Sequence, residues 1–205
     1  MSNDGSYESR NSELFMPDRM LMLDGVLQSR SKGEEAYHEA LVHPVMFSHD
    51  NPKRVAIIGG GEGATLREVL KHNTVETAIM LEIDEIMVQV SKQYLPTWSD
   101  CSDIVGSTTS CFEDPRADVY YEDAIGWFLH RYGNDGEKAE PLDVIIMDAL
   151  YVCLVLLFPI YDGDLTLSLL LSEIHRMKLN LQTPCIPMTI LLVRFTLPWL
   201  MTVSW

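Results

Sequence analysis

Short apolar runs alternate with helical segments between residues 54 and 148, and this alternation constrains the fold more than any other feature of the sequence. The expected strands are residues 54–58, 77–81, 117–121 and 142–147, and the expected helices are residues 64–72, 86–94 and 124–132. The first run is apolar along most of its length, as in a strand buried on both faces. Strands that alternate with helices at this spacing predict an α/β domain with a parallel sheet.

The segment before this alternation has a different pattern. Residues 20–30 place Asp24 and Gly25 between apolar residues, which predicts a β-hairpin. Residues 34–43 have helical periodicity, and Asn51-Pro52 breaks the chain before the first strand of the sheet. Four parts are therefore expected: a polar, disordered N-terminus at 1–18, a β-hairpin region at 19–50, a nucleoside-binding domain at 51–150 and a divergent apolar tail at 151–205.

The tail is rich in Leu, Met and Pro and has no clear rhythm of strands and helices. Its first apolar run, residues 151–160, is too short to cross a bilayer. Residues 186–203 are long enough, but Pro187, Arg194 and Pro198 interrupt them. We therefore expect a buried or poorly folded tail rather than a membrane segment.

The net charge of −15 restricts the partners of the chain. Residues 151–205 contain three acids and three bases, so the whole of this charge lies in the first 150 residues. Nucleic acid is excluded as a partner because its phosphates are repelled by an acidic surface. A cationic ligand fits the charge, and so does a general acidic bias that favours solubility.

The cysteines and the N-terminus indicate the compartment. Cys101, Cys111, Cys153 and Cys185 form no C-x-x-C pair, so the spacing indicates neither a zinc site nor a thioredoxin motif. The first ten residues are polar and lack the apolar stretch of a signal peptide. We expect a cytoplasmic protein with reduced thiols and no bound metal.

The residues that follow the four predicted strands are the candidate ligand-binding and catalytic residues. These strands are followed by the glycine loop Gly59-Gly60-Gly61-Glu62-Gly63, by Glu82, by Asp123 and by Asp148. Ligands of open α/β sheets bind at the carboxyl ends of the strands. A glycine loop followed about 20 residues later by an acid at the next strand end is typical of a nucleoside site, in which that acid binds the ribose hydroxyls.

Glu62 limits which nucleoside this loop accepts. The carboxylate of Glu62 would repel a pyrophosphate bound at the loop. The ammonium of S-adenosylmethionine is compatible with Glu62, so methyl transfer stays open, although that ligand also carries a carboxylate. Decarboxylated S-adenosylmethionine has only an aminopropyl ammonium at this end, which suits an acid through a charge-assisted hydrogen bond.

Six segments resemble the spermidine synthase family of polyamine aminopropyltransferases in order and spacing. They are LDGVLQS at 23–29, AYHEALVHP at 36–44, NPKRVAIIGGGEGATLREVLKH at 51–72, EID at 82–84, DPRADVYYEDA at 114–124 and LDVIIMDA at 142–149. The glycine loop and the Tyr37-His38-Glu39 segment resemble the thermospermine synthase branch most. The resemblance implies a Rossmann-like sheet of the S-adenosylmethionine-binding type, and members of the family usually form homodimers or homotetramers.

The resemblance also implies the ligands and the role of each site residue. The co-substrate is decarboxylated S-adenosylmethionine, the acceptor is putrescine or spermidine, and no prosthetic group is used. Asp148 resembles the general base of the family, and Tyr37 and His38 resemble residues at the amine end of the site. The implied nucleoside-binding residues are Gln28, Gly59, Gly60, Gly61, Glu62 for the aminopropyl ammonium, Glu82 for the ribose, and Asp123 and Ala124 for the adenine.

The chain departs from the family at the fourth strand end. The family has Asp-x-x-Asp-Pro there, whereas Asp148 is followed by Ala149, Leu150 and Tyr151, so the second acid is absent. No resemblance is seen from Tyr151 onward. One hypothesis is that the reading frame or the splicing changes after codon 150, and detection of tail peptides by mass spectrometry would contradict it. A four-strand sheet would expose an edge and an apolar face, so an inactive fragment or a regulatory subunit is an alternative to an active enzyme.

Overall fold

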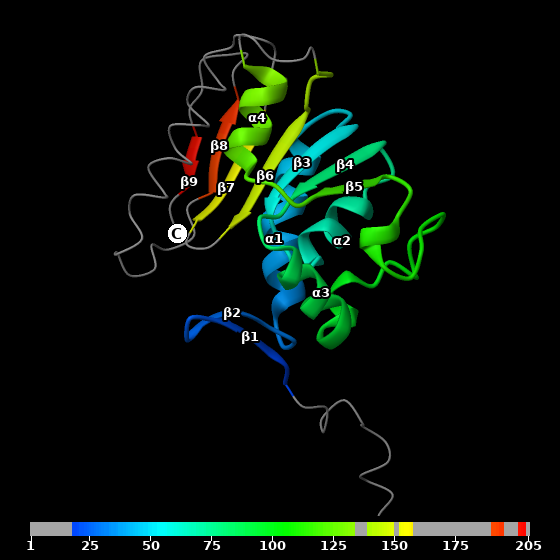
Figure 1. Cartoon of the computed structure of the whole chain (residues 1–205). Helices are drawn as coiled ribbons and strands as arrows, with labels where there is room; N and C mark the ends of the chain where they lie inside the picture. The colour runs from blue at the N-terminus through cyan, green and yellow to red at the C-terminus, as the bar shows by residue number, and fades with distance from the viewer. Residues whose placement is uncertain (1–17, 134–138, 150–151, 158–189, 195–200, 204–205) are drawn as a thin grey trace, which may run out of the picture.

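The computed structural model describes residues 18–133, 139–149, 152–157, 190–194 and 201–203. A two-stranded hairpin, β1 (Met20–Leu23) and β2 (Val26–Arg30), lies apart from a larger sheet in Figure 1. Asp24 and Gly25 both have positive φ, of 49° and 79°, as the two central residues of a type I′ turn require. The predicted hairpin is therefore confirmed, and the disordered N-terminus at 1–18 lies almost wholly outside the described residues.

The larger sheet has the strand order β5-β4-β3-β6-β7-β8-β9. Its first four strands pair in parallel and are the strands expected from the sequence. Their bounds are β3 (Arg54–Gly59), β4 (Thr77–Leu81), β5 (Ala117–Tyr120) and β6 (Val144–Ala149). The chain runs from β3 outward to β5 and then returns to β6 on the other side of β3. This reversal makes the carboxyl ends of β3 and β6 the topological switch point, where ligands of such sheets bind.

Helices cover both faces of these strands (Figure 1). The helices are α1 (Glu34–Ser48), α2 (Ala64–Leu70), α3 (Glu85–Tyr94) and α4 (Ala124–Tyr132). Val55 and Ile57 of β3 belong to a core with α1, α2 and α3, whereas Ala56 and Ile58 belong to a second core with α4. Burial on both faces explains the apolar character of the first predicted strand.

Helix α1 extends beyond its predicted end at residue 43. Pro44 lies inside it and cannot donate a backbone hydrogen bond. The helix continues because Val45 and Met46 of the next turn are buried in the core between the helices and the sheet. Burial of these two side chains, worth about 1.5–3 kcal/mol each, offsets the lost hydrogen bond.

The tail forms more structure than the sequence predicts. Strand β7 (Val152–Leu157) pairs antiparallel with β6, β8 (Ile190–Arg194) pairs parallel with β7, and β9 (Met201–Val203) pairs antiparallel with β8. The expected open edge beside β6 is therefore wrong, because β7 covers it. The remaining tail residues lie outside the described part of the chain. No helix in that described part has the length and apolar character that a membrane span requires.

The connection from residue 97 to 116 corrects one expectation about the cysteines. Cys101 and Cys111 form a buried disulfide, so reduced thiols are the wrong prediction for this pair. Two short 3₁₀ helices, Pro96–Ser99 and Cys111–Glu113, flank the bridged segment. Sequence spacing did not indicate the bridge because the two cysteines are ten residues apart and meet only after the connection folds back on itself. The cytoplasmic location stays a prediction.

Candidate active site

The glycine loop and Asp148 meet at the switch point of the sheet. Gly59 is the register partner of Asp148 on β6, and the backbone N–H of Gly60 donates to the Asp148 carbonyl at 2.9 Å. Gly59 has a φ of 83°, and a Cβ at this position would lie 2.2 Å from the same carbonyl oxygen. Only glycine allows the loop to approach β6 this closely.

The Asp148 carboxylate is held by two hydroxyl donors. Thr65, in the first turn of α2, donates to Oδ2 at 2.5 Å, and Tyr37 of α1 donates to Oδ1 at 3.4 Å. Burial and the charge of Glu62 raise the pKa of Asp148 to about 6, and the opposing effects of His38 and the two hydroxyl groups keep it from rising further. At neutral pH the carboxylate is therefore largely ionised and able to accept a proton.

His38 lies behind this carboxylate with a fully buried side chain. Its Nε2 is 3.1 Å from Glu62 Oε1 and 3.9 Å from Asp148 Oδ2, while its Nδ1 lies 2.7 Å from the backbone carbonyl of Glu34. Burial alone would lower the pKa of His38, but the hydrogen bonds to Glu34 and Glu62 and the charge of Asp148 outweigh it and raise the pKa to about 10. The ring is therefore an imidazolium at neutral pH.

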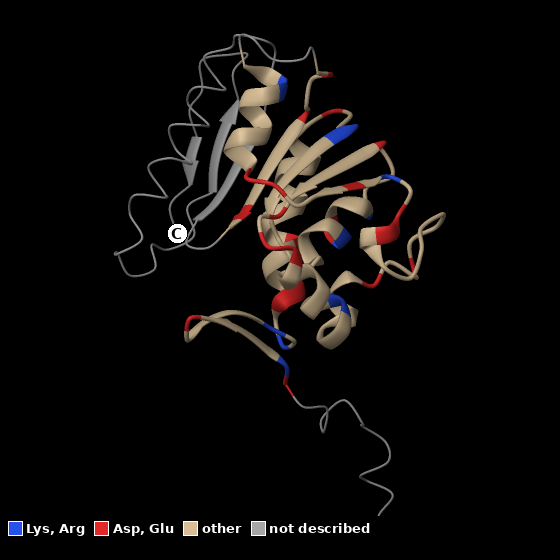
Figure 2. Ribbon diagram, in the orientation of Figure 1, with Lys and Arg blue, Asp and Glu red and all other residues tan. Residues whose placement is uncertain are grey.

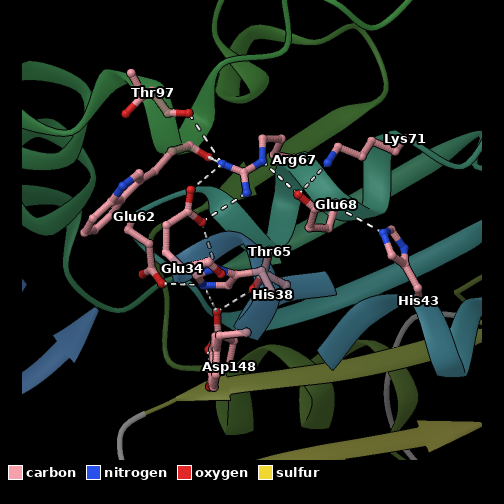
Figure 3. Close-up of polar contacts among 12 residues, drawn as sticks. Glu34, His38, His43, Glu62, Thr65, Arg67, Glu68, Lys71, Thr97 and Asp148 are labelled. Atoms are coloured by element: carbon pink, nitrogen blue, oxygen red, sulfur yellow. Dashed lines mark hydrogen bonds and ion pairs between the residues drawn. The ribbon is translucent and has the colours of Figure 1, made fainter. Parts of the chain in front are cut away.

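A buried ion-pair network supports His38 from the side away from Asp148 (Figure 3). The two terminal nitrogens of Arg67 each donate to one oxygen of Glu34 at 3.0 Å, and its Nε donates to Glu68 at 2.8 Å. Arg67 also donates to the backbone carbonyl of Trp98 at 3.0 Å. Bidentate pairing fixes the Glu34 carboxylate against His38.

Sequence reasoning missed Glu34, Thr65, Arg67 and Glu68. The structure shows why two of them matter: Arg67 and Glu68 are charged residues in the middle of α2, a helix that is buried all round. Buried charges are retained only when they are paired or functional. Amphipathic periodicity alone does not reveal the partners, because Glu34 lies on a different helix, 33 residues from Arg67.

Glu82 lies beside the glycine loop, as its predicted contact with a ribose requires. A Cβ on Gly61 would be 2.9 Å from Glu82 Oε2, and Oε1 accepts from the Asp84 backbone N–H at 2.9 Å. Burial and the charge of Glu62 raise the pKa of Glu82. The charge of Glu62 therefore acts on both Asp148 and Glu82.

Asp123 and Ala124 lie at the start of α4, just after the end of β5. Asp123 caps the helix by accepting from the Gly126 backbone N–H at 3.1 Å, and Ala124 is the first helical residue. Their predicted contact with adenine stays a prediction. Figure 2 shows acidic segments gathered where the strands end, on the side of the sheet that faces the hairpin.

Gln28 lies on β2 of the hairpin, where its side-chain amide donates to the Val26 carbonyl at 3.2 Å. This hydrogen bond is local. Its predicted role in lining the nucleoside site therefore stays a prediction.

His38, Glu62 and Asp148 lie close enough together to share a metal ion. The raised pKa of His38 disfavours this, because an imidazolium has no lone pair for a metal. The arrangement suits organic cations better. The carboxylate groups of Asp148 and Glu62 can bind an ammonium or a sulfonium directly.

The fold and the site define a class: a Rossmann-like α/β protein with an acidic ligand site beside a glycine loop at the switch point. The spermine/spermidine synthase domain family matches residues 34–155. The chain belongs to this family. The match continues to residue 155, so the expectation of no resemblance from Tyr151 onward is wrong for residues 151–155.

Similar proteins agree with this assignment. The chain is 48% identical over 130 residues to polyamine aminopropyltransferase 1 of Hyperthermus butylicus. The aligned region covers 63% of this chain and 40% of that protein. It is 41% identical over 167 residues to the polyamine aminopropyltransferase of Aeropyrum pernix, covering 81% of this chain and 46% of that protein.

Solved structures show the same likeness. The crystal structure of spermidine synthase from Thermotoga maritima matches with a TM-score of 0.52 and 40% identity, over 65% of this chain and 41% of that one. A spermidine synthase in complex with the transition-state analogue AdoDATO matches with a TM-score of 0.51 and 40% identity, over 63% of this chain and 39% of that one. The chain thus spans less than half of the length of these relatives, from 39% to 46%.

Proposed function

We propose that the chain binds decarboxylated S-adenosylmethionine and transfers its aminopropyl group to a polyamine. One observation carries the proposal: besides burial, the charge of Glu62 raises the pKa of both Asp148 and Glu82, so Glu62 repels each of these two acids beside the glycine loop. A ligand with an ammonium and a sulfonium relieves this repulsion. Ordinary S-adenosylmethionine adds a carboxylate and relieves less of it, which disfavours methyl transfer.

The transfer is a single displacement. The lone pair of the acceptor nitrogen attacks the aminopropyl carbon next to sulfur, the C–N bond forms and the C–S bond breaks. The bonding electrons pass to sulfur, which becomes the neutral thioether of 5′-methylthioadenosine. The proton lost by the acceptor nitrogen goes to Asp148.

The residues around Asp148 prepare it for this role. An alkylammonium has a pKa of about 10.4 by analogy with lysine, far above the value of about 6 for Asp148. The positive sulfonium lowers the pKa of the acceptor nitrogen and narrows the gap. Thr65 and Tyr37 orient the carboxylate, and carboxylates that neutralise two cationic reactants allow them to be held in line.

The test is product analysis with the full chain. Incubation with decarboxylated S-adenosylmethionine and either putrescine or spermidine should release 5′-methylthioadenosine, and chromatography of the polyamine identifies the acceptor. Thermospermine as product would support the branch inferred from the glycine loop. Asp148→Asn should abolish transfer and leave nucleoside binding largely intact. The matched control is Asp118→Asn, which removes an exposed acid on β5.

A non-catalytic subunit is the second candidate, because Asp148 is followed by Ala149, Leu150 and Tyr151 and the second acid of the family's Asp-x-x-Asp-Pro segment is absent. Calorimetric binding of decarboxylated S-adenosylmethionine without product from either amine would establish this reading. Tighter binding of ordinary S-adenosylmethionine would refute the proposal and support methyl transfer.

A further inference from the structure

A second polar cluster lies beside the buried ion pair of Arg67 and Glu68, where α1 packs against α2 (Figure 3). Glu39 and His43 are four residues apart on α1 and so share one face of that helix. Glu68 of α2 faces them. One ligand-type atom from each of the three residues lies within 4.8 Å of the others. The proposed function uses none of these three side chains for the ligand.

Glu68 carries an unsatisfied atom in this cluster. The side chain is fully buried, and its Oε1 accepts from Arg67 and Lys71 at 2.8 Å each. Its Oε2 has no hydrogen-bond partner in the described part of the chain, although His43 Nε2 is only 3.2 Å away. The contact is thus close but lacks hydrogen-bond geometry. A buried carboxylate oxygen without a hydrogen bond costs about 1–3 kcal/mol or more.

The separation fits two ligands of one metal ion. Nitrogen and oxygen ligands lie about 2.0–2.2 Å from zinc, so two of them at a tetrahedral angle are roughly 3.4 Å apart. The observed 3.2 Å between His43 Nε2 and Glu68 Oε2 is close to this spacing. Glu39 is exposed and offers the third ligand atom, which leaves further positions for water.

His72 completes the arrangement around His43. Its Nε2 lies 3.0 Å from His43 Nδ1. When His43 Nδ1 carries the proton and donates it to His72, the Nε2 lone pair faces Glu68 Oε2. A metal-bound histidine typically donates its other ring N–H in this way, which fixes its tautomer.

We propose that Glu39, His43 and Glu68 form a binding site for a first-row divalent transition metal ion such as Zn²⁺. The imidazole excludes a preference for Ca²⁺ or Mg²⁺, which take oxygen ligands. The site is half open, since the side chain of His43 is 26% exposed and Glu39 is exposed. The metal replaces the close His43–Glu68 contact with two coordinate bonds and satisfies the buried oxygen.

The experiment is calorimetric titration of the full chain with ZnCl₂ in a non-chelating buffer. We expect one Zn²⁺ per chain. Loss of an outer-shell partner already costs about 10–100-fold in metal affinity, so Glu39→Ala and His43→Ala should each weaken binding by at least about tenfold. His49→Ala, which removes the half-buried histidine that follows the last residue of α1, should leave the affinity unchanged.

Two further controls keep the result interpretable. Glu62→Gln distinguishes this site from the group of His38, Glu62 and Asp148, and it should leave Zn²⁺ binding unchanged. Circular dichroism and thermal unfolding show whether His43→Ala still folds; Glu39→Ala removes an exposed side chain and is expected to fold in any case. Absence of Zn²⁺ binding to the wild-type chain, or binding that survives both Glu39→Ala and His43→Ala, would overturn the proposal.

Discussion

The close packing of Gly63 gives a prediction that separates backbone strain from crowding. Gly63 precedes α2 with a φ of 87°, and a Cβ there would lie 2.6 Å from the Cβ of Ser99 and 2.7 Å from the ring of Phe112. Gly106 has nearly the same φ, 84°, but no atom lies within 4 Å of its Cβ position. At nearly equal φ, the two glycines therefore differ in crowding.

The magnitudes follow from these two geometries. An alanine at positive φ costs about 1–2 kcal/mol, and this strain applies to both Gly63→Ala and Gly106→Ala. Overpacking adds about 1–3 kcal/mol at Gly63 only. Ser99 and Phe112 cannot move away easily, because they are buried beside the bridge between Cys101 and Cys111. Gly63→Ala should thus lower the free energy of unfolding by about 2–5 kcal/mol.

Urea unfolding followed by circular dichroism measures the difference. With an m-value of about 2 kcal/mol/M, the midpoint of Gly63→Ala should lie roughly 1 M below that of Gly106→Ala. Equal midpoints for the two variants would refute the reasoning, because crowding at Gly63 would then cost nothing. A changed m-value would indicate that the loop, rather than the whole domain, unfolds.

Three other perturbations have expected outcomes. Thr65→Val removes a hydrogen bond that lowers the pKa of Asp148, so the acidic limb of the pH profile of kcat/KM should shift to higher pH; an unchanged limb would contradict a role for this hydroxyl. The raised pKa of His38 stabilises the fold fully below about pH 6.5, and this contribution is lost as the pH rises toward about 10. Urea midpoints should fall over that range in the wild type and fall less in His38→Gln; parallel curves would refute the assignment. Reduction of the bridge between Cys101 and Cys111 should cost about 2–4 kcal/mol, measured by unfolding with and without dithiothreitol, and Cys101→Ser should show no effect of the reductant.

Sequence patterns predicted the elements that depend on local residues. The short apolar runs located all four parallel strands, and Asp24-Gly25 located the hairpin turn, because these signals depend on neighbours in the chain. The predicted end of α1 at residue 43 was wrong, since burial of Val45 and Met46 outweighs the local effect of Pro44. The sequence analysis did not predict strand β7, because this strand forms by pairing with β6 and no periodicity in the tail indicates that pairing.

The glycine loop and the acids at the strand ends were determined by the sequence alone. In a parallel sheet the strand ends converge at one edge, so Glu62, Glu82 and Asp148 had to lie near each other once the strands were placed. Only the tertiary structure decided the state of these acids. The charge on His38 and the pKa of Asp148 depend on burial and on partners from α1 and α2, which are far apart in the chain. Electrostatic effects act through space, whereas sequence patterns report only on neighbours along the backbone.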